Sequence, residues 1–114
     1  MANTFKNKTS KGVGTSLTQI GSYAVAASTQ TTVIGLSVSN ITRSSVDVDV
    51  QLSATMANTT NDISLGTTIP VPAGSTVVLI GGDQKLVMET GNLLKVKSSA
   101  ASSLDVVMRI LEIT

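Results

Sequence analysis

The residues that usually carry enzyme chemistry are missing from this chain. Its 114 residues include no histidine, no cysteine and no tryptophan, and its aromatic side chains are those of Phe5 and Tyr23. Without imidazole or thiol groups it lacks the ordinary general base, the thiolate nucleophile and the soft metal ligands. The composition therefore predicts a protein that is not an enzyme and that holds no cofactor and no metal.

Three polar groups of residues could still carry chemistry, and each has a simpler interpretation. Asp47 and Asp49 could bind calcium or share a proton, but they alternate with valines, so we interpret them as the solvated face of a strand. Residues 12–16 faintly resemble a phosphate-binding loop but lack its lysine and the helix that follows, which favours a hinge. Lys95 and Lys97 share a strand face, yet net charge +1 and two aromatic residues predict no nucleic-acid partner.

Charge is uneven along the chain. Residues 1–46 carry four basic residues and no acid, which gives +4, whereas residues 47–114 carry four basic and seven acidic residues, which gives −3. We interpret residues 1–14 as an N-terminal arm that is mobile in the free protein, ahead of one domain over residues 15–114. In an assembly we expect the arm to become ordered, with Phe5 as its apolar anchor and three lysines that reach acidic groups of a neighbour: Lys6, Lys8 and Lys11.

The body of the chain alternates apolar and polar residues with a period of two, which is typical of half-buried strands. Residues 32–40 and 46–54 show this most clearly, and the polar turn between them predicts an antiparallel pair. Residues 15–25 predict an earlier strand with a bend, residues 58–62 a loop, and residues 81–83 a tight turn. The continuous apolar run at 76–80 is typical of a strand buried on both sides.

The last predicted strand, residues 104–113, carries apolar residues on both faces. One face has Leu104, Val106, Met108 and Ile110. The other face adds three more apolar residues, which we interpret as partner-binding positions: Val107, Leu111 and Ile113. We expect the second sheet or another subunit to cover that face, so the chain is predicted to form a homo-oligomer or to bind a shell partner.

About eight short strands separated by turns indicate an all-β fold: a small antiparallel β-sandwich or barrel, Greek-key, Ig-like or jelly-roll-like, with an extended N-terminal arm. No apolar run approaches the roughly 20 residues of a membrane helix, and the polar N-terminus has no apolar segment of a secretion signal. The sequence predicts no membrane partner.

Five segments of the chain share one recognisable pattern, which the opening residues 1–7 also fit: residues 31–40, 69–75, 77–87, 89–98 and 107–114. Together they resemble a family of small virion structural proteins of tailed bacteriophages, notably phages of cyanobacteria and other marine bacteria. Asn92 departs from the acidic residue expected after Glu89-Thr90-Gly91, at a turn position.

The resemblance implies a non-enzymatic component of the virion. A decoration, cement or neck component of the phage head or head–tail region is the leading hypothesis, and its partners would be other virion proteins, that is capsid, neck or tail subunits. A tail or baseplate accessory protein is the alternative. A small-ligand or glycan-binding module is a third, disfavoured because few aromatic rings are present to stack on sugars.

Overall fold

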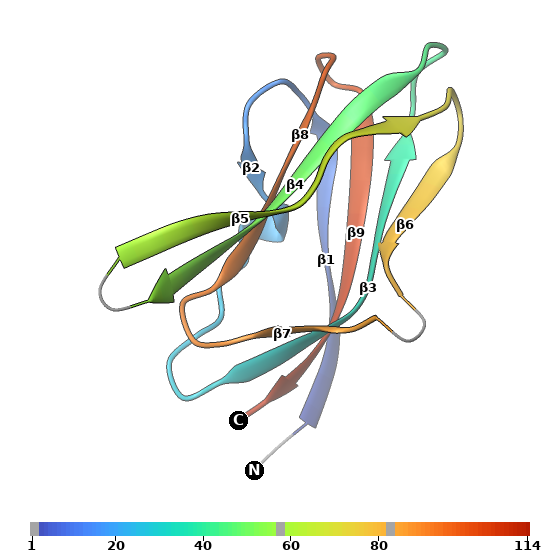
Figure 1. The fold of residues 1–114 in the computed structure, drawn as a ribbon. Helices are drawn as coiled ribbons and strands as arrows, with labels where there is room; N and C mark the ends of the chain where they lie inside the picture. Colours follow the sequence, from blue (N-terminus) through green and yellow to red (C-terminus); the bar gives the residue numbers. More distant parts are fainter. Residues whose placement is uncertain (1–2, 57–58, 82–83) are drawn as a thin grey trace.

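The computed structural model describes residues 3–56, 59–81 and 84–114, which form two antiparallel sheets packed face to face (Figure 1). Sheet A has the order β1-β9-β3-β6, and β7 also pairs with β3; its strands are β1 (Asn3–Val13), β9 (Leu104–Ile113), β3 (Gln30–Asn40), β6 (Thr76–Ile80) and β7 (Leu86–Met88). Sheet B has the order β2-β8-β4-β5; its strands are β2 (Thr18–Gln19), β8 (Leu93–Ser98), β4 (Val46–Met56) and β5 (Thr59–Val71). The predicted all-β sandwich is confirmed.

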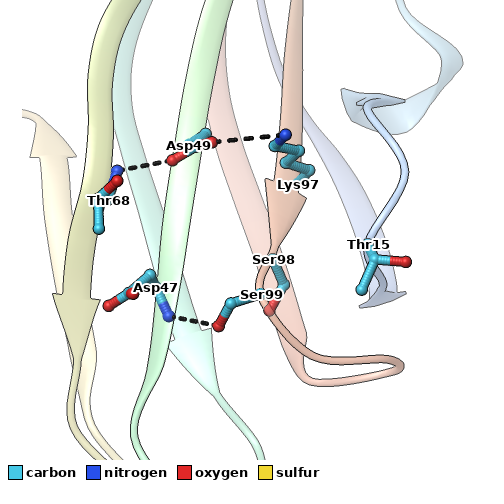
Figure 2. A pocket seen from close by; sticks show the side chains of 7 residues that line it. All are labelled: Thr15, Asp47, Asp49, Thr68, Lys97, Ser98 and Ser99. Atoms are coloured by element: carbon cyan, nitrogen blue, oxygen red, sulfur yellow. Dashed lines mark hydrogen bonds and ion pairs between the residues drawn. The ribbon is translucent and has the colours of Figure 1, made fainter.

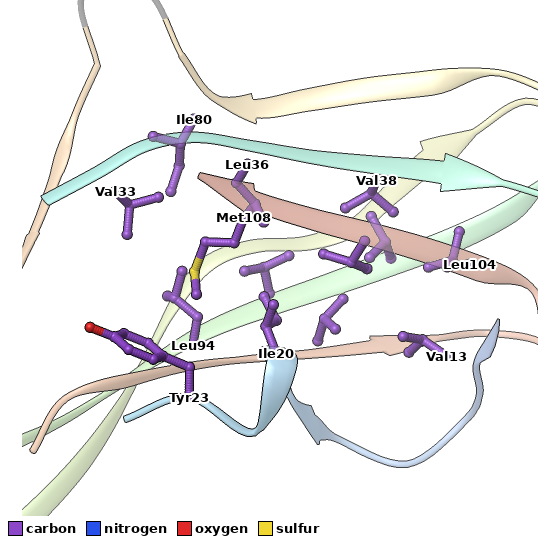
Figure 3. Packing of buried hydrophobic residues seen from close by; sticks show 14 of the residues in the cluster. Val13, Ile20, Tyr23, Val33, Leu36, Val38, Ile80, Leu94, Leu104 and Met108 are labelled. Carbon is purple, nitrogen blue, oxygen red and sulfur yellow. The ribbon is translucent and has the colours of Figure 1, made fainter. Parts of the chain in front are cut away.

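The core lies between the two sheets and is mainly aliphatic, with Tyr23 at one end of the cluster drawn in Figure 3. In β9 the four residues predicted to face inward, from Leu104 to Ile110, are fully buried. Val48 and Val50 of β4 meet them from the other sheet and are also fully buried. Period-two alternation therefore identified the buried face of both strands.

The predicted pairing of the two clearest strands is wrong, because β3 lies in sheet A and β4 in sheet B. The turn between them carries the chain from one sheet to the other. Buried Asn40 holds this crossing: its Nδ2 donates to the carbonyls of Ser44, at 2.8 Å, and of Val71, at 2.9 Å. The polar residues of this turn thus bridge two layers instead of closing a hairpin.

Residues 15–25 form less strand than predicted, and residues 59–62 form more. The first segment contains only β2 and a single 3-10 turn, η1 (Ile20–Ser22), and residues 59–62 belong to β5 instead of a loop. Residue 58 of the predicted loop and residues 82–83 of the predicted tight turn lie outside the described residues. Around that turn, the amide of Gln84 donates to the carbonyl of Gly81 at 3.1 Å.

The apolar run at residues 76–80 forms β6, but β6 is not buried on both sides as predicted. Among the described residues it pairs only with β3, at the edge of sheet A, and Val78 is 66% exposed. The second apolar face of this strand therefore points to solvent.

The N-terminal segment also differs from the predicted arm. Residues 3–13 form β1, which pairs with β9 in antiparallel register from Asn3 opposite Ile113 to Ser10 opposite Val106. The segment is extended, as expected, but it lies within sheet A and not outside the body. Without β1, strand β9 would be an edge strand with unpaired backbone groups. These groups form hydrogen bonds with the backbone of β1, so β1 becomes a strand although its polar side chains do not predict one.

Candidate interaction surface

The apolar residues predicted to bind a partner gather on one surface, the side of sheet A that faces away from the core. We call this surface the outer face of sheet A. Phe5 of β1 lies directly opposite Leu111 of β9, and the same pair of strands sets Thr9 opposite Val107. Ile113 follows Leu111 by two residues, so it shares this face by the alternation of the strand.

Strand register extends these positions into two rows that cross the sheet. One row runs Phe5–Leu111–Thr32–Val87, and the other runs Thr9–Val107–Ser37–Val78. Phe5 is 74% exposed, Val78 66% and Val87 64%. Val78 and Val87 were missed by sequence reasoning, because only the register shows that their strands present these side chains beside Val107 and Leu111.

Arg109 lies between the two rows and carries the positive charge of this face. Its partner on β3 is Gly35, and a Cβ added there would be in ordinary contact with the Arg109 side chain, 3.7 Å from Nη1. A shallow hollow of about 520 Å³ lies here, lined by Arg109 together with Phe5, Lys6, Asn7, Ile34, Val107 and Ile110. Within the described part of the chain Arg109 has no ion pair. An apolar surface with one unpaired arginine is a common composition for a protein-binding surface.

The outer face of sheet B is polar by contrast. A hollow of about 340 Å³ on it is lined by Thr15, Asp47, Asp49, Thr68, Lys97, Ser98 and Ser99 (Figure 2). Asp49 accepts a 2.6 Å hydrogen bond from the amide of Thr68 and lies 3.7 Å from the ammonium of Lys97. Asp47 and Asp49 are therefore on a wet strand face, as predicted. The carboxylate of Asp49 contacts both neighbouring strands, through Thr68 of β5 and Lys97 of β8.

The three lysines of β1 do not point the same way. The ammonium of Lys6 lies 2.8 Å from Oε1 of Glu112, and the ammonium of Lys8 lies 5.4 Å from the centre of the Tyr23 ring. Lys11 is exposed beside a slip in the register of β1. Two of the three lysines predicted to reach a neighbour thus have partners within the chain.

Tyr23 and Glu112 form a small hydrogen-bonded group beneath β1. The hydroxyl of Tyr23 donates to Oε2 of Glu112 at 2.7 Å and lies 2.7 Å from Oγ1 of Thr31. Burial raises the pKa of Tyr23 to about 12, and hydrogen bonds from Lys6 and then Tyr23 lower the pKa of Glu112 below 4.5. Each group is held in its ordinary charge state at neutral pH, so Glu112 is charged opposite Lys6 and this pair ties β1 to the body.

The geometry of the acidic residues offers no metal centre within residues 3–56, 59–81 and 84–114, where no three histidine, cysteine or acidic residues are grouped. Over the same ranges, no helix has the length and apolar character needed to cross a membrane.

Comparison with known proteins gives distant structural similarities. No protein-family model matches the sequence, and no curated protein matches it. The fold is similar to a chain of the disulfide-linked pili of Bacillus endospore appendages, with a TM-score of 0.46 and 14% identity over 99% of this chain and 85% of that one. It is also similar to a chain of the virus-like particle of extra small virus from the giant freshwater prawn Macrobrachium rosenbergii, with a TM-score of 0.41 and 13% identity over 98% of this chain and 79% of that one.

Proposed function

We propose that this chain is a non-enzymatic structural subunit of a phage virion, a decoration, cement or neck component of the head or head–tail region. The observation that carries the proposal is the contrast between its two outer faces. Sheet B presents hydrogen-bonded polar and charged side chains, whereas sheet A presents Phe5, Val78 and Val87 largely exposed. The resemblance to virion proteins in residues 31–40, 69–75, 77–87, 89–98 and 107–114 points to the phage particle as the setting.

The size of the apolar face fits a protein interface. The four strands of the path β1-β9-β3-β6 have 11, 10, 11 and 5 residues. At about 3.3 Å per residue and about 4.8 Å between strands, the face covers about 600 Å². An interface of ordinary size takes about 800 Å² from each partner. One neighbouring molecule would be enough to cover the whole face.

The energy of this contact favours assembly through many copies. Burying such a side chain completely contributes about 1.5–3 kcal/mol. Phe5, Val78 and Val87 are each about two-thirds exposed, so covering all three contributes about 3–6 kcal/mol. Loss of translational and rotational freedom on association costs at least about 4 kcal/mol. A single contact is then weak, but a subunit held at two or more contacts gains from effective concentration. Decoration and cement proteins act in this way, by shape and copy number.

An electron-microscopy map of the particle that carries this protein tests the proposal. We expect copies at the head or neck, with the outer face of sheet A turned toward a neighbour and that of sheet B toward solvent. Copies on the tail or baseplate would favour the alternative of a tail accessory protein. A purified chain that stays monomeric at high concentration and is missing from particles would refute a structural role.

A further inference from the structure

Strand β1 differs from the other long strands because it buries almost no apolar side chain. Its residues from Asn3 to Gly12 include one apolar side chain, Phe5, which points to the outer face and is 74% exposed. The residues that face the body are polar: Lys6, Lys8 and Ser10. Such a strand can leave its sheet without carrying an apolar row into water, which a strand such as β9 cannot do.

The body receives this polar row with a matched set of contacts. Lys6 pairs with Glu112, Lys8 lies over the ring of Tyr23, and Oγ of Ser10 accepts a 2.9 Å hydrogen bond from the amide of Gly21. A side chain at position 21 would come within 2.7 Å of Cβ of Lys8 and 3.2 Å of the amide nitrogen of Thr9, so glycine is needed for this close approach. These contacts form a specific slot for the strand.

The slot would be costly to leave empty. Without β1, the carboxylate of Glu112 loses its lysine, and β9 shows an unpaired edge along about eight residues of ladder, from Val106 to Ile113. When its own β1 is absent, this site on β9 therefore favours binding of the same strand from another copy of the chain.

A hinge lies where β1 joins the body. Gly12 has a φ of +61°, and the register slips between Ser10 and Val13. Beyond it the chain is fixed, since Val13 is buried and its carbonyl accepts a 3.0 Å hydrogen bond from the amide of Ser103. The unit that can move is thus residues 3–12. Because residues 3–10 are used in the ladder with β9, only the chain from Ser10 to Val13 can bridge two copies, so their hinges must lie within about 10 Å of each other.

We propose that β1 is exchanged between copies: residues 3–12 of one subunit leave their own sheet and pair with β9 of a second copy in the same register. The proposal rests on the proposed function, because a particle supplies the neighbouring copies. The contacts that hold the strand are the same within one chain and between two, so local concentration decides which form prevails. In the exchanged form, Phe5 of one subunit completes the apolar outer face of its neighbour. The two copies are then held together by the same non-covalent contacts that hold β1 within one chain.

Cysteine cross-linking tests the exchange directly, because the native chain has no cysteine. Thr9 and Val107 are register partners, so their Cα atoms lie about 4.5–5.5 Å apart, within the range that a disulfide spans. Thr9→Cys and Val107→Cys chains are mixed at high concentration, unfolded and refolded together, and oxidised. The matched control mixes Thr9→Cys with Ser37→Cys, since Ser37 is the partner of Val107 on its other side and is two strands from Thr9 in either arrangement.

We expect the first mixture to give disulfide-linked heterodimers well above the control, and a Thr9→Cys/Val107→Cys double variant to give covalent multimers. Assemblies in which the double variant forms only internal disulfides, with no heterodimer above the control, would overturn the exchange and leave the structural role intact. A chain that is monomeric at every concentration, with internal disulfides only, would overturn both. Cross-linked dimers that never join larger assemblies or particles would keep the exchange and overturn the structural role.

Gly12→Ala provides a second measurement that does not depend on cysteine. The new Cβ meets nothing closer than 4.0 Å, so the substitution acts only through the strained φ of +61°. If the chain straightens at this residue on exchange, the variant shifts the ratio of exchanged to closed chains upward by about 5- to 30-fold. An unchanged ratio would show that residue 12 is not the hinge.

Discussion

Two adjacent valines of β9 give the sharpest test of the assembly surface. Val106 is fully buried, whereas Val107 points to the outer face of sheet A. We expect Val106→Asp to unfold the domain and Val107→Asp to leave it folded while it abolishes self-association or binding to the particle.

The magnitudes follow from the environment of each side chain. At position 106 the variant loses about 2 kcal/mol of apolar burial. Keeping a buried Asp neutral at pH 7 costs about 4 kcal/mol more, since its ordinary pKa of about 3.9 lies roughly three units lower. The total of about 6 kcal/mol compares with the 6–17 kcal/mol expected for a domain of this length. At position 107 we expect a loss of at most about 1 kcal/mol.

Thermal unfolding followed by circular dichroism measures the first effect, and sedimentation at increasing concentration measures the second. The thermal midpoint should fall by more than about 20 °C for Val106→Asp and by less than about 8 °C for Val107→Asp. Ser64→Asp is the control, since Ser64 is exposed and lies opposite Gln51 in sheet B. If Val107→Asp associates and binds particles as well as Ser64→Asp does, the outer face of sheet A is not the contact surface.

Three further predictions concern the core, the polar group beneath β1 and β1 itself. Leu36→Asp should unfold the domain because Leu36 is fully buried, whereas Asp49→Ala should lose about 1 kcal/mol with its hydrogen bond to Thr68 and stay folded; equal unfolding midpoints in urea would contradict this assignment. Because its pKa is lowered in the folded chain, ionised Glu112 stabilises the fold above pH 4.5, and this stabilisation is lost as the pH falls through the lowered pKa. Glu112→Gln should therefore flatten the acid side of a curve of unfolding free energy against pH. An unchanged acid side would show that the contact with Lys6 does not contribute to stability. Removal of residues 1–11 should lower the thermal midpoint, at roughly 4–8 °C per kcal/mol, and expose the amides of β9 to hydrogen exchange; a midpoint and exchange rates like those of the full chain would mean that β1 is not docked in solution.

The parts of the fold that the sequence predicted are those where a local pattern reports burial. Period-two alternation located β4 and β9 and assigned their inward faces, since the inward residues of β9 from Leu104 to Ile110 are apolar and buried. Pairing between strands is not local, so the hairpin expected across the turn at residues 40–45 was wrong. That turn and a hairpin turn have the same polar composition, and only the bonds of Asn40 to Ser44 and Val71 distinguish them.

The candidate surface was predicted in part for the same reason. Phe5, Val107 and Leu111 stand out in the sequence as apolar residues in polar or already half-buried segments. Val78 does not, because a continuous apolar run is typical of a strand with two covered faces and gives no sign of which face stays uncovered. Val87 sits in a strand of three residues, too short for its alternation to be informative.

Strand β1 could not be predicted from its own residues, because what makes it a strand belongs to β9. Its sequence is polar on the face toward the body and nearly so on the other, which is also the composition of a mobile terminus. The ladder to β9 and the pair Lys6–Glu112 supply the stability that the sequence of β1 lacks.

Strand β9 therefore takes part in three sets of contacts. Its inward residues pack in the core, its outward residues form part of the apolar face, and its edge opposite β3 pairs with β1. Successive side chains of a strand point to opposite faces, so substitutions at inward positions of β9 affect folding and those at outward positions affect assembly. The edge that binds β1 is made of backbone groups, so neither kind of substitution removes it. A subunit built this way can fold first and exchange residues 3–12 later, since this part of β1 carries none of the apolar core, which begins at Val13.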